Sequence, residues 1–112
     1  KIEAIFRPER VNTVTAALLD VGVTGFHYQN VTGQGQQQGV EVVTARGGQS
    51  ASRSAVPKTL LVTVIPDNKK EIVVDTIVSS TRTGEIGDGK IFITTVEEVI
   101  RVRTGERGEQ AI

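Results

Sequence analysis

The sequence predicts an α+β fold in which a four-stranded antiparallel sheet carries two helices on one face. Three observations support this prediction. Short apolar runs with strand character occur at residues 1–7, 26–32, 58–65 and 90–96. Apolar residues at helical spacing separate the first two runs and the last two, and a long polar segment separates the middle pair. The resulting βαββαβ order is that of the ferredoxin-like sandwich.

The first half of the chain alternates and then changes to helical spacing. Apolar residues alternate along 1–7, and Pro8 both ends this strand and suits the first turn of a helix. Apolar residues recur at helical spacing over 11–21, and Gly22 supplies a C-terminal stop. A second strand is expected at 26–32.

The segment from Gly33 to Val56 differs from the rest in composition. It is rich in Gly, Gln, Ser, Ala and Arg and has few large apolar residues. Such a segment buries too little apolar surface to offset the entropy lost on ordering, so a long mobile loop is expected, centred on residues 36–56. Loops of this length in compact domains are often functional.

A strand follows Pro57. Residues 58–65 place apolar side chains on both faces, so both faces are expected to be covered, one by the helices and the other by a neighbouring subunit.

The last third repeats the helix-to-strand change. Asp67 is the expected N-cap of a helix whose apolar stripe covers residues 72–78 and which ends at Gly84. A fourth strand is expected at 90–96 and a short final strand at 101–104.

Composition limits the possible functions. The chain of 112 residues and 12.0 kDa predicts one domain, residues 1–112. Thirteen basic and thirteen acidic residues balance, so neither a general nucleic-acid binder nor a polybasic membrane binder is expected. The absence of cysteine excludes disulfides, thiol catalysis and thiolate metal sites. No apolar run approaches the roughly 20 residues that span a bilayer. We therefore expect a cytoplasmic protein without direct membrane insertion.

Two motifs favour anion binding. Three glycines, an aspartate and a lysine lie between apolar runs in TGEIGDGKIF, residues 83–92. Glycines let backbone N–H groups converge on an anion and lysine adds positive charge, so the motif predicts a phosphate cradle, with a plain Gly-rich turn as the alternative. Arg101 and Arg103 stand two residues apart, which places both guanidinium groups on one face of the expected strand. A solvated edge strand is the alternative there.

The same motifs, TGEIGDGKIF and IRVRTGE, resemble the B-loop (83–90) and C-loop (101–106) of the nitrogen-regulatory PII signal-transduction family. The resemblance extends over almost the whole chain and makes residues 36–56 the T-loop. It implies a homotrimer that binds ATP or ADP in the clefts between subunits. It also implies that the nucleotide controls the T-loop and, through it, a target such as a membrane transporter, which recruits the protein to the membrane, or a nitrogen-metabolism enzyme.

The resemblance also implies roles for individual residues. The implied nucleotide-binding residues are Ile5, His27, Gly33, Gly35, Gln36, Gln37, Val64, Ile86, Gly87, Asp88, Gly89, Lys90, Arg101 and Arg103. The implied 2-oxoglutarate residues are Gln37, Gln38, Gly39 and Lys58, with Gln37 also coordinating Mg²⁺ when ATP and the oxoacid are bound. The implied target contacts are Arg46, Gly47 and Arg53.

Several departures from the family pattern leave alternatives open. The loop has no tyrosine, so tyrosine-linked nucleotidylation cannot occur there. Gln36 stands where an arginine is common, Val62 where a glutamate is common, and His27 where a small hydroxylated residue is common. One alternative is an ATP/ADP sensor that does not bind 2-oxoglutarate and regulates a transporter unrelated to ammonium. A weak ATPase and a structural adaptor are the others. An enzyme is not expected, because His27 is the only histidine and no catalytic pair is evident.

Overall fold

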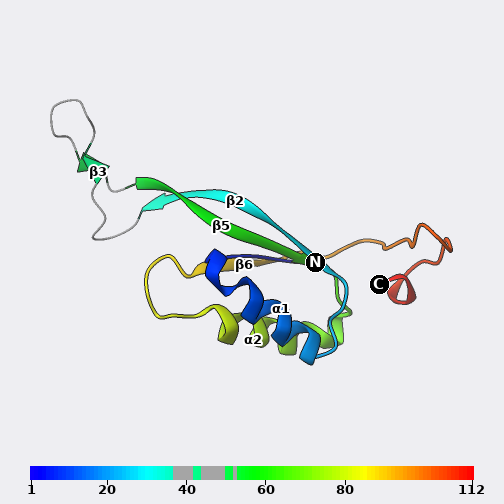
Figure 1. Ribbon diagram of the computed structural model, residues 1–112. Helices are drawn as coiled ribbons and strands as arrows, with labels where there is room; N and C mark the ends of the chain where they lie inside the picture. The colour runs from blue at the N-terminus through cyan, green and yellow to red at the C-terminus, as the bar shows by residue number, and fades with distance from the viewer. Residues whose placement is uncertain (37–41, 44–49, 52) are drawn as a thin grey trace.

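The computed structural model describes residues 1–36, 42–43, 50–51 and 53–112 (Figure 1). It contains two α-helices, α1 (Val11–Asp20) and α2 (Lys70–Thr81), each preceded by a short 3-10 turn, η1 (Pro8–Arg10) or η2 (Asp67–Lys69). The described strands are β1 (Ile2–Phe6), β2 (Phe26–Gln36), β3 (Val42–Val43), β4 (Ser50–Ala51), β5 (Arg53–Thr63) and β6 (Gly89–Ile93). A last 3-10 turn, η3, covers Glu109–Ala111.

The main sheet has the order β2-β5-β1-β6 and all its pairs are antiparallel. β1 and β5 are central, while β2 and β6 form the edges. Both helices lie on the same side of this sheet (Figure 1). The predicted α+β, ferredoxin-like arrangement is therefore confirmed. β3 and β4 pair with each other in a separate two-stranded ladder.

The core lies between the sheet and the two helices. The inward residues of β1 alternate along the strand and are 1% exposed: Ile2, Ala4 and Phe6. They meet the apolar stripes of both helices, whose buried members are Val14, Leu18, Val73 and Ile77. Buried residues therefore recur at every second position in the strand and at every third or fourth position in the helices, as the sequence pattern predicted.

The opposite face of the sheet carries no helix (Figure 1). We call it the open face and define it by Ile5, His27, Lys58, Leu60, Val62 and Lys90. Strand register places these residues together, because Ile5 pairs with both Leu60 and Lys90, and Val62 pairs with His27. Leu60 and Val62 keep partial exposure within a single chain. The expected covering of this face by a neighbouring subunit stays a prediction.

β2 and β5 extend further than the sequence indicated. The loop predicted from Gly33 to Val56 is wrong at both ends, because pairing continues from Thr32↔Pro57 to Gln36↔Arg53. Pro57 is tolerated because β1 ends opposite Thr59, so at Pro57 the β5 strand has only β2 beside it. The two strands project beyond the sheet as a hairpin arm (Figure 1).

The start of the second helix also differs from the prediction. Asp67 is not its N-cap: Pro66 precedes η2 in an extended conformation, and no side-chain capping hydrogen bond forms at either η2 or α2. The ring of Pro66 restricts the backbone φ just before the turn, and Asp67 is the first residue of the 3-10 turn.

Candidate functional site

The loop between α2 and β6 is organised around the Asp88 carboxylate. Its Oδ2 accepts hydrogen bonds from the backbone N–H groups of Thr83 (2.8 Å) and Gly84 (2.9 Å). Its Oδ1 accepts from the Thr83 hydroxyl and from Nε of Arg7 (3.2 Å). These donors, with the Thr83 hydroxyl the largest influence, hold the pKa of Asp88 well below its usual range. The carboxylate therefore stays charged and fixes the shape of the loop.

Two cationic side chains converge on Gly87. Nη2 of Arg7 donates to the carbonyl of Ile86 at 2.8 Å, and Nζ of Lys58 donates to the carbonyl of Gly87. A Cβ built on Gly87 lies 3.4 Å from Arg7 Nη2 and 3.6 Å from Lys58 Nζ. Burial lowers the pKa of Lys58, and the positive charge of Arg7 lowers it further. Such a pair of neighbouring cations attracts an anion.

Sequence reasoning missed Arg7. Phe6 pairs with Thr59 in the β1–β5 ladder, and both face the helices. Side chains alternate between the two faces of a sheet, so Arg7, which follows Phe6, and Lys58, which precedes Thr59, both lie on the open side. Both then reach the same loop. The sequence did contain a signal for Arg7: it follows the first strand and stands two residues after Ile5, which places it on the same face of the sheet as that predicted nucleotide residue.

The glycines of this loop have conformations that other residues rarely adopt. Gly84, Gly87 and Gly89 have φ of +89°, +101° and +107°. A Cβ on Gly89 would lie 1.8 Å from the carbonyl oxygen of Ile5, so only glycine permits β6 to approach β1 there. Within the described part of the chain, the N–H groups of Ile86 and Gly87 donate no hydrogen bond. Because the Ile86 carbonyl accepts from Arg7 and the Ile86–Gly87 peptide is trans, the Gly87 N–H points away from Arg7.

Several predicted nucleotide residues lie on or beside the open face. Lys90 is exposed and pairs with Ile5 in the adjacent strand. His27 is exposed and pairs with Val62. Gly33 packs under Lys58, since a Cβ on Gly33 would lie 3.1 Å from Lys58 Cγ. The structure therefore places Lys90 and Gly33 near the glycine loop or Lys58, whereas His27 lies toward the other end of the sheet, in the row with Val62 and Glu3.

Gly35 and Gln36 end β2, where their backbones pair with Ser54 and Arg53. The other predicted loop residues, Gln37, Gln38, Gly39, Arg46 and Gly47, lie outside the described residues. Arg53 begins β5.

The two C-terminal arginines are not on a strand, so the predicted strand at 101–104 is wrong. Arg101–Thr104 forms a turn in which the N–H of Gly105 donates to the carbonyl of Arg101 at 2.7 Å. Gly105, with φ of +73°, lets the chain reverse at this point. This segment lies at the end of the sheet opposite to the glycine loop (Figure 1). Within one chain, therefore, Arg101 and Arg103 do not join the loop residues.

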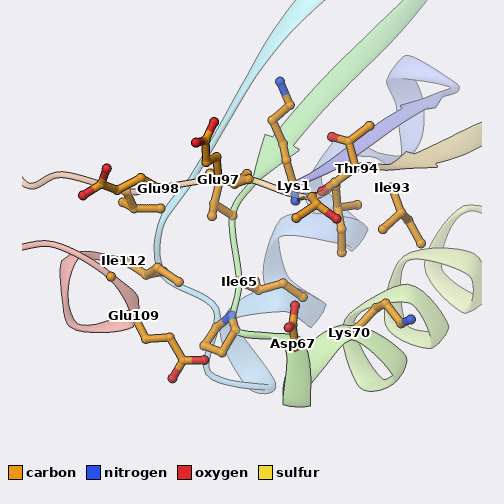
Figure 2. Close-up of a pocket in the computed structure, with 17 residues that line it drawn as sticks. Lys1, Ile65, Asp67, Lys70, Ile93, Thr94, Glu97, Glu98, Glu109 and Ile112 are labelled. Atoms are coloured by element: carbon orange, nitrogen blue, oxygen red, sulfur yellow. Dashed lines mark hydrogen bonds between the residues drawn. The ribbon is translucent and has the colours of Figure 1, made fainter.

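Two cavities flank the sheet. One of about 380 Å³ lies between β6 and α2, and its lining includes four predicted residues, Ile5, Asp88, Gly89 and Lys90. The other, of about 360 Å³, lies at the opposite end. Figure 2 shows Ile65 and Asp67 on one side of it and Glu109 and Ile112, from the C-terminal segment, on another. Val64 is the only predicted nucleotide residue that lines this second cavity.

The described residues offer neither a metal cluster nor a membrane-spanning helix. No group of three or more His, Asp or Glu side chains there is placed to hold a metal ion. No helix in the same part of the chain has the length and apolar character needed to cross a membrane.

Known proteins give an independent comparison. The family model described as nitrogen regulatory protein P-II matches residues 1–106. A nitrogen regulatory protein P-II homolog from Arabidopsis thaliana is 46% identical over 112 residues, which covers 99% of this chain and 56% of that protein. A nitrogen regulatory protein P-II from Nostoc punctiforme is 43% identical and is covered over 98% of its length, with 100% of this chain.

A solved structure agrees with the sequence relatives. The crystal structure of Arabidopsis thaliana PII bound to citrate matches with a TM-score of 0.79 and 40% identity, covering 99% of this chain and 89% of that one. The chain spans about half the length of the plant relatives from Arabidopsis and Oryza sativa, 56% and 52%. The family model and relatives above 40% identity lead to one conclusion: the chain belongs to the nitrogen regulatory protein P-II family.

Proposed function

We propose that this protein is an adenylate-sensing regulator that binds ATP and ADP in the clefts between the subunits of a homotrimer. The observation that carries the proposal is the meeting of Arg7 and Lys58 at Gly87, in a loop where the Ile86 N–H has no acceptor among the described residues. Cations neutralise polyphosphate charge, and fixed amides orient its oxygens. Proteins of this family are regulators that form trimers and act on target proteins.

Assembly completes the proposed site. The open face carries Leu60 and Val62, which in a trimer pack around the threefold axis. The glycine loop and the start of β6 lie at one end of the sheet, while the C-terminal segment that contains Arg101 and Arg103 lies at the other (Figure 1). A neighbouring subunit is therefore the proposed source of the arginines that reach phosphates held at the loop of its partner.

β5 provides a physical link from nucleotide to T-loop. Lys58 contacts Gly87 and lies in the same continuous strand as Arg53, which is at the far end of the described arm. Gly33, on the paired strand β2, packs against the Lys58 stem. ATP and ADP differ by one phosphate, so they attract Lys58 unequally and favour different arm conformations. The arm then engages or releases a target, such as a membrane transporter or a nitrogen-metabolism enzyme, with recruitment to the membrane in the former case.

An oxoacid is a second proposed ligand. Arg7 and Lys58 suit a carboxylate, and the Arabidopsis relative of known structure is bound to citrate, a carboxylate anion. We propose that 2-oxoglutarate binds there together with Mg²⁺ and ATP, with Gln37 to Gly39 contributing from the T-loop.

One observation favours the narrower function of an ATP/ADP sensor that does not bind 2-oxoglutarate. Lys58 already donates to the Gly87 carbonyl, so an oxoacid must displace that hydrogen bond. This competition lowers the affinity for the oxoacid relative to a free lysine.

Calorimetric titration distinguishes these functions. ATP and ADP are titrated with Mg²⁺, in the presence and absence of 2-oxoglutarate, into the wild type and Lys90→Ala. Lys90→Ala should weaken ATP binding by roughly tenfold or more, because a charge-assisted contact is lost. Lys69→Ala is the matched control, since the Lys69 amine lies beside Gly22, away from the glycine loop, and Lys69 lines neither cavity.

The pattern of results decides between the proposals. Tighter ATP binding in the presence of the oxoacid identifies a combined carbon, nitrogen and energy sensor, and reciprocity requires the converse effect. Nucleotide binding that the oxoacid leaves unchanged identifies the ATP/ADP sensor. If neither nucleotide binds, the proposed function is refuted.

A further inference from the structure

Arg101 is held by the C-terminal part of its own chain. Its Nη2 donates to the backbone oxygens of Gln110 at 3.1 Å and Ile112 at 3.3 Å. Its Nη1 lies 3.4 Å from Oε1 of Glu106. We call residues 108–112 the tail. Three acceptors therefore occupy the guanidinium group that the proposed nucleotide site requires.

The tail has anchors that do not involve Arg101. The N–H of Gly108 donates to the carbonyl of Val99 at 3.1 Å, and within the tail the N–H of Ala111 donates to the carbonyl of Gly108 at 2.9 Å, which closes the 3-10 turn. Ala111 is only 8% exposed. These contacts hold the Gln110 and Ile112 oxygens in place, so the tail presents Arg101 with a preformed set of acceptors.

Arg103 provides a contrast two residues away. It is exposed, and in the described residues its side chain makes neither a hydrogen bond nor an ion pair. The two arginines of the same turn therefore differ: Arg103 is available to a ligand, whereas Arg101 is restrained.

From this geometry we propose that the tail is an internal competitor for Arg101, which must leave the Gln110 and Ile112 oxygens before it can contact nucleotide phosphates. This inference rests on the proposed nucleotide-binding function. A polyphosphate oxygen carries more negative charge than a backbone oxygen, so phosphate displaces the tail. Displacement still removes existing hydrogen bonds, and this cost weakens the apparent nucleotide affinity. Linkage makes the effect reciprocal: a bound nucleotide removes the contacts between the tail and Arg101 and so loosens the tail, which keeps its hydrogen bond from Gly108 to Val99.

The test dislodges the tail without changing Arg101. Ala111→Asp places a charge at a buried position and should displace the tail. We expect the variant to bind ATP roughly three- to tenfold more tightly than the wild type, because the hydrogen bonds to the tail no longer compete. Gln110→Ala is the matched control, because it keeps the backbone oxygen that Arg101 contacts.

A double-mutant comparison assigns the effect to Arg101. In an Arg101→Ala background, Ala111→Asp should leave ATP affinity unchanged, since nothing remains to release. Equal tightening in both backgrounds overturns the proposal, and so does unchanged or weaker ATP binding by Ala111→Asp. If ATP still binds the wild type in these cases, the proposed function survives while the competing tail does not.

The wild type supplies a measurement that does not depend on variant folding. Hydrogen exchange at the amides of Ala111 and Ile112 should accelerate by roughly threefold or more when ATP saturates the protein, because the tail loses its contact with Arg101. Unchanged protection at both amides under saturating ATP excludes the competing tail.

Discussion

Replacement of Gly89 by alanine is the sharpest test of how the glycine loop joins the sheet. A Cβ at this position would lie 1.8 Å from the Ile5 carbonyl oxygen and 2.8 Å from its carbon, and both are backbone atoms that no rotamer change can move. Gly89 also has φ of +107°, which adds roughly 1–2 kcal/mol of backbone strain for an L residue. Relief of the clash requires β6 to move away from β1, which weakens ladder hydrogen bonds of about 1 kcal/mol each. The expected loss is roughly 3 kcal/mol or more in the free energy of unfolding.

Gly84→Ala is the matched control for this experiment. Gly84 has a similar φ of +89°, but no atom lies within 4 Å of the Cβ that alanine would add. The control therefore carries the backbone strain without the clash and should cost about 1–2 kcal/mol. Urea unfolding of both variants and the wild type, at one protomer concentration, measures the difference. A Gly89→Ala protein as stable as Gly84→Ala refutes the close approach of β6 to β1.

Three further outcomes are expected. Leu61→Ala, at a fully buried position, should lower the free energy of unfolding by roughly 2–5 kcal/mol. Leu19→Ala is the control, because Leu19 is 54% exposed and its loss should change the free energy of unfolding by less than about 1 kcal/mol. Urea unfolding compares the two variants, and equal effects contradict the assignment of Leu61 to the core. Asp88→Asn should lower the urea midpoint at pH 7. The difference from the wild type should shrink as the pH falls below about 4, because the pKa of Asp88 is lowered by folding and protonation removes its advantage; a pH-independent difference excludes this explanation. Arg7→Ala should weaken ATP or 2-oxoglutarate binding by roughly tenfold in calorimetry while the helical circular dichroism is retained, and unchanged affinity for both ligands removes Arg7 from the site.

The main sheet was predictable because its signals are periodic. The alternation of apolar residues in β1 and their helical spacing in α1 each indicate an element with one buried face. The order of strands and helices along the chain then allows only a few ways of connecting them. The ends of β2 and β5 were not predictable from composition. Residues 33–36 and 53–56 contain little apolar surface, yet they pair through backbone hydrogen bonds, which do not depend on side-chain burial.

The candidate site was also only partly predictable, because some of its contacts join residues that are far apart in the sequence. The glycine loop was predicted from its own residues and Lys58 from the family resemblance, whereas Arg7 was missed because its partners, Ile86 and Asp88, lie about eighty residues away in the chain. The alternating pattern Arg101-Val102-Arg103 predicted a strand. The turn chemistry of Thr104 and Gly105 prevailed, since a local hydrogen bond closes the turn without help from distant strands.

The continuity of β5 restricts how the arm can move. Lys58 lies on the open side, and its neighbour Thr59 lies on the helix side. If β5 slid by one residue against β1, Lys58 would turn into the core and Thr59 would turn away from it, so single-residue steps are forbidden. A slide by two residues preserves the faces but breaks every existing pair in the ladder. The movements that remain for β5 are changes of twist and bend at fixed register, and such changes grow with distance from the end clamped by β1. Arg53, at the far end of the strand from Thr63, is therefore displaced further than Lys58 by the same bend.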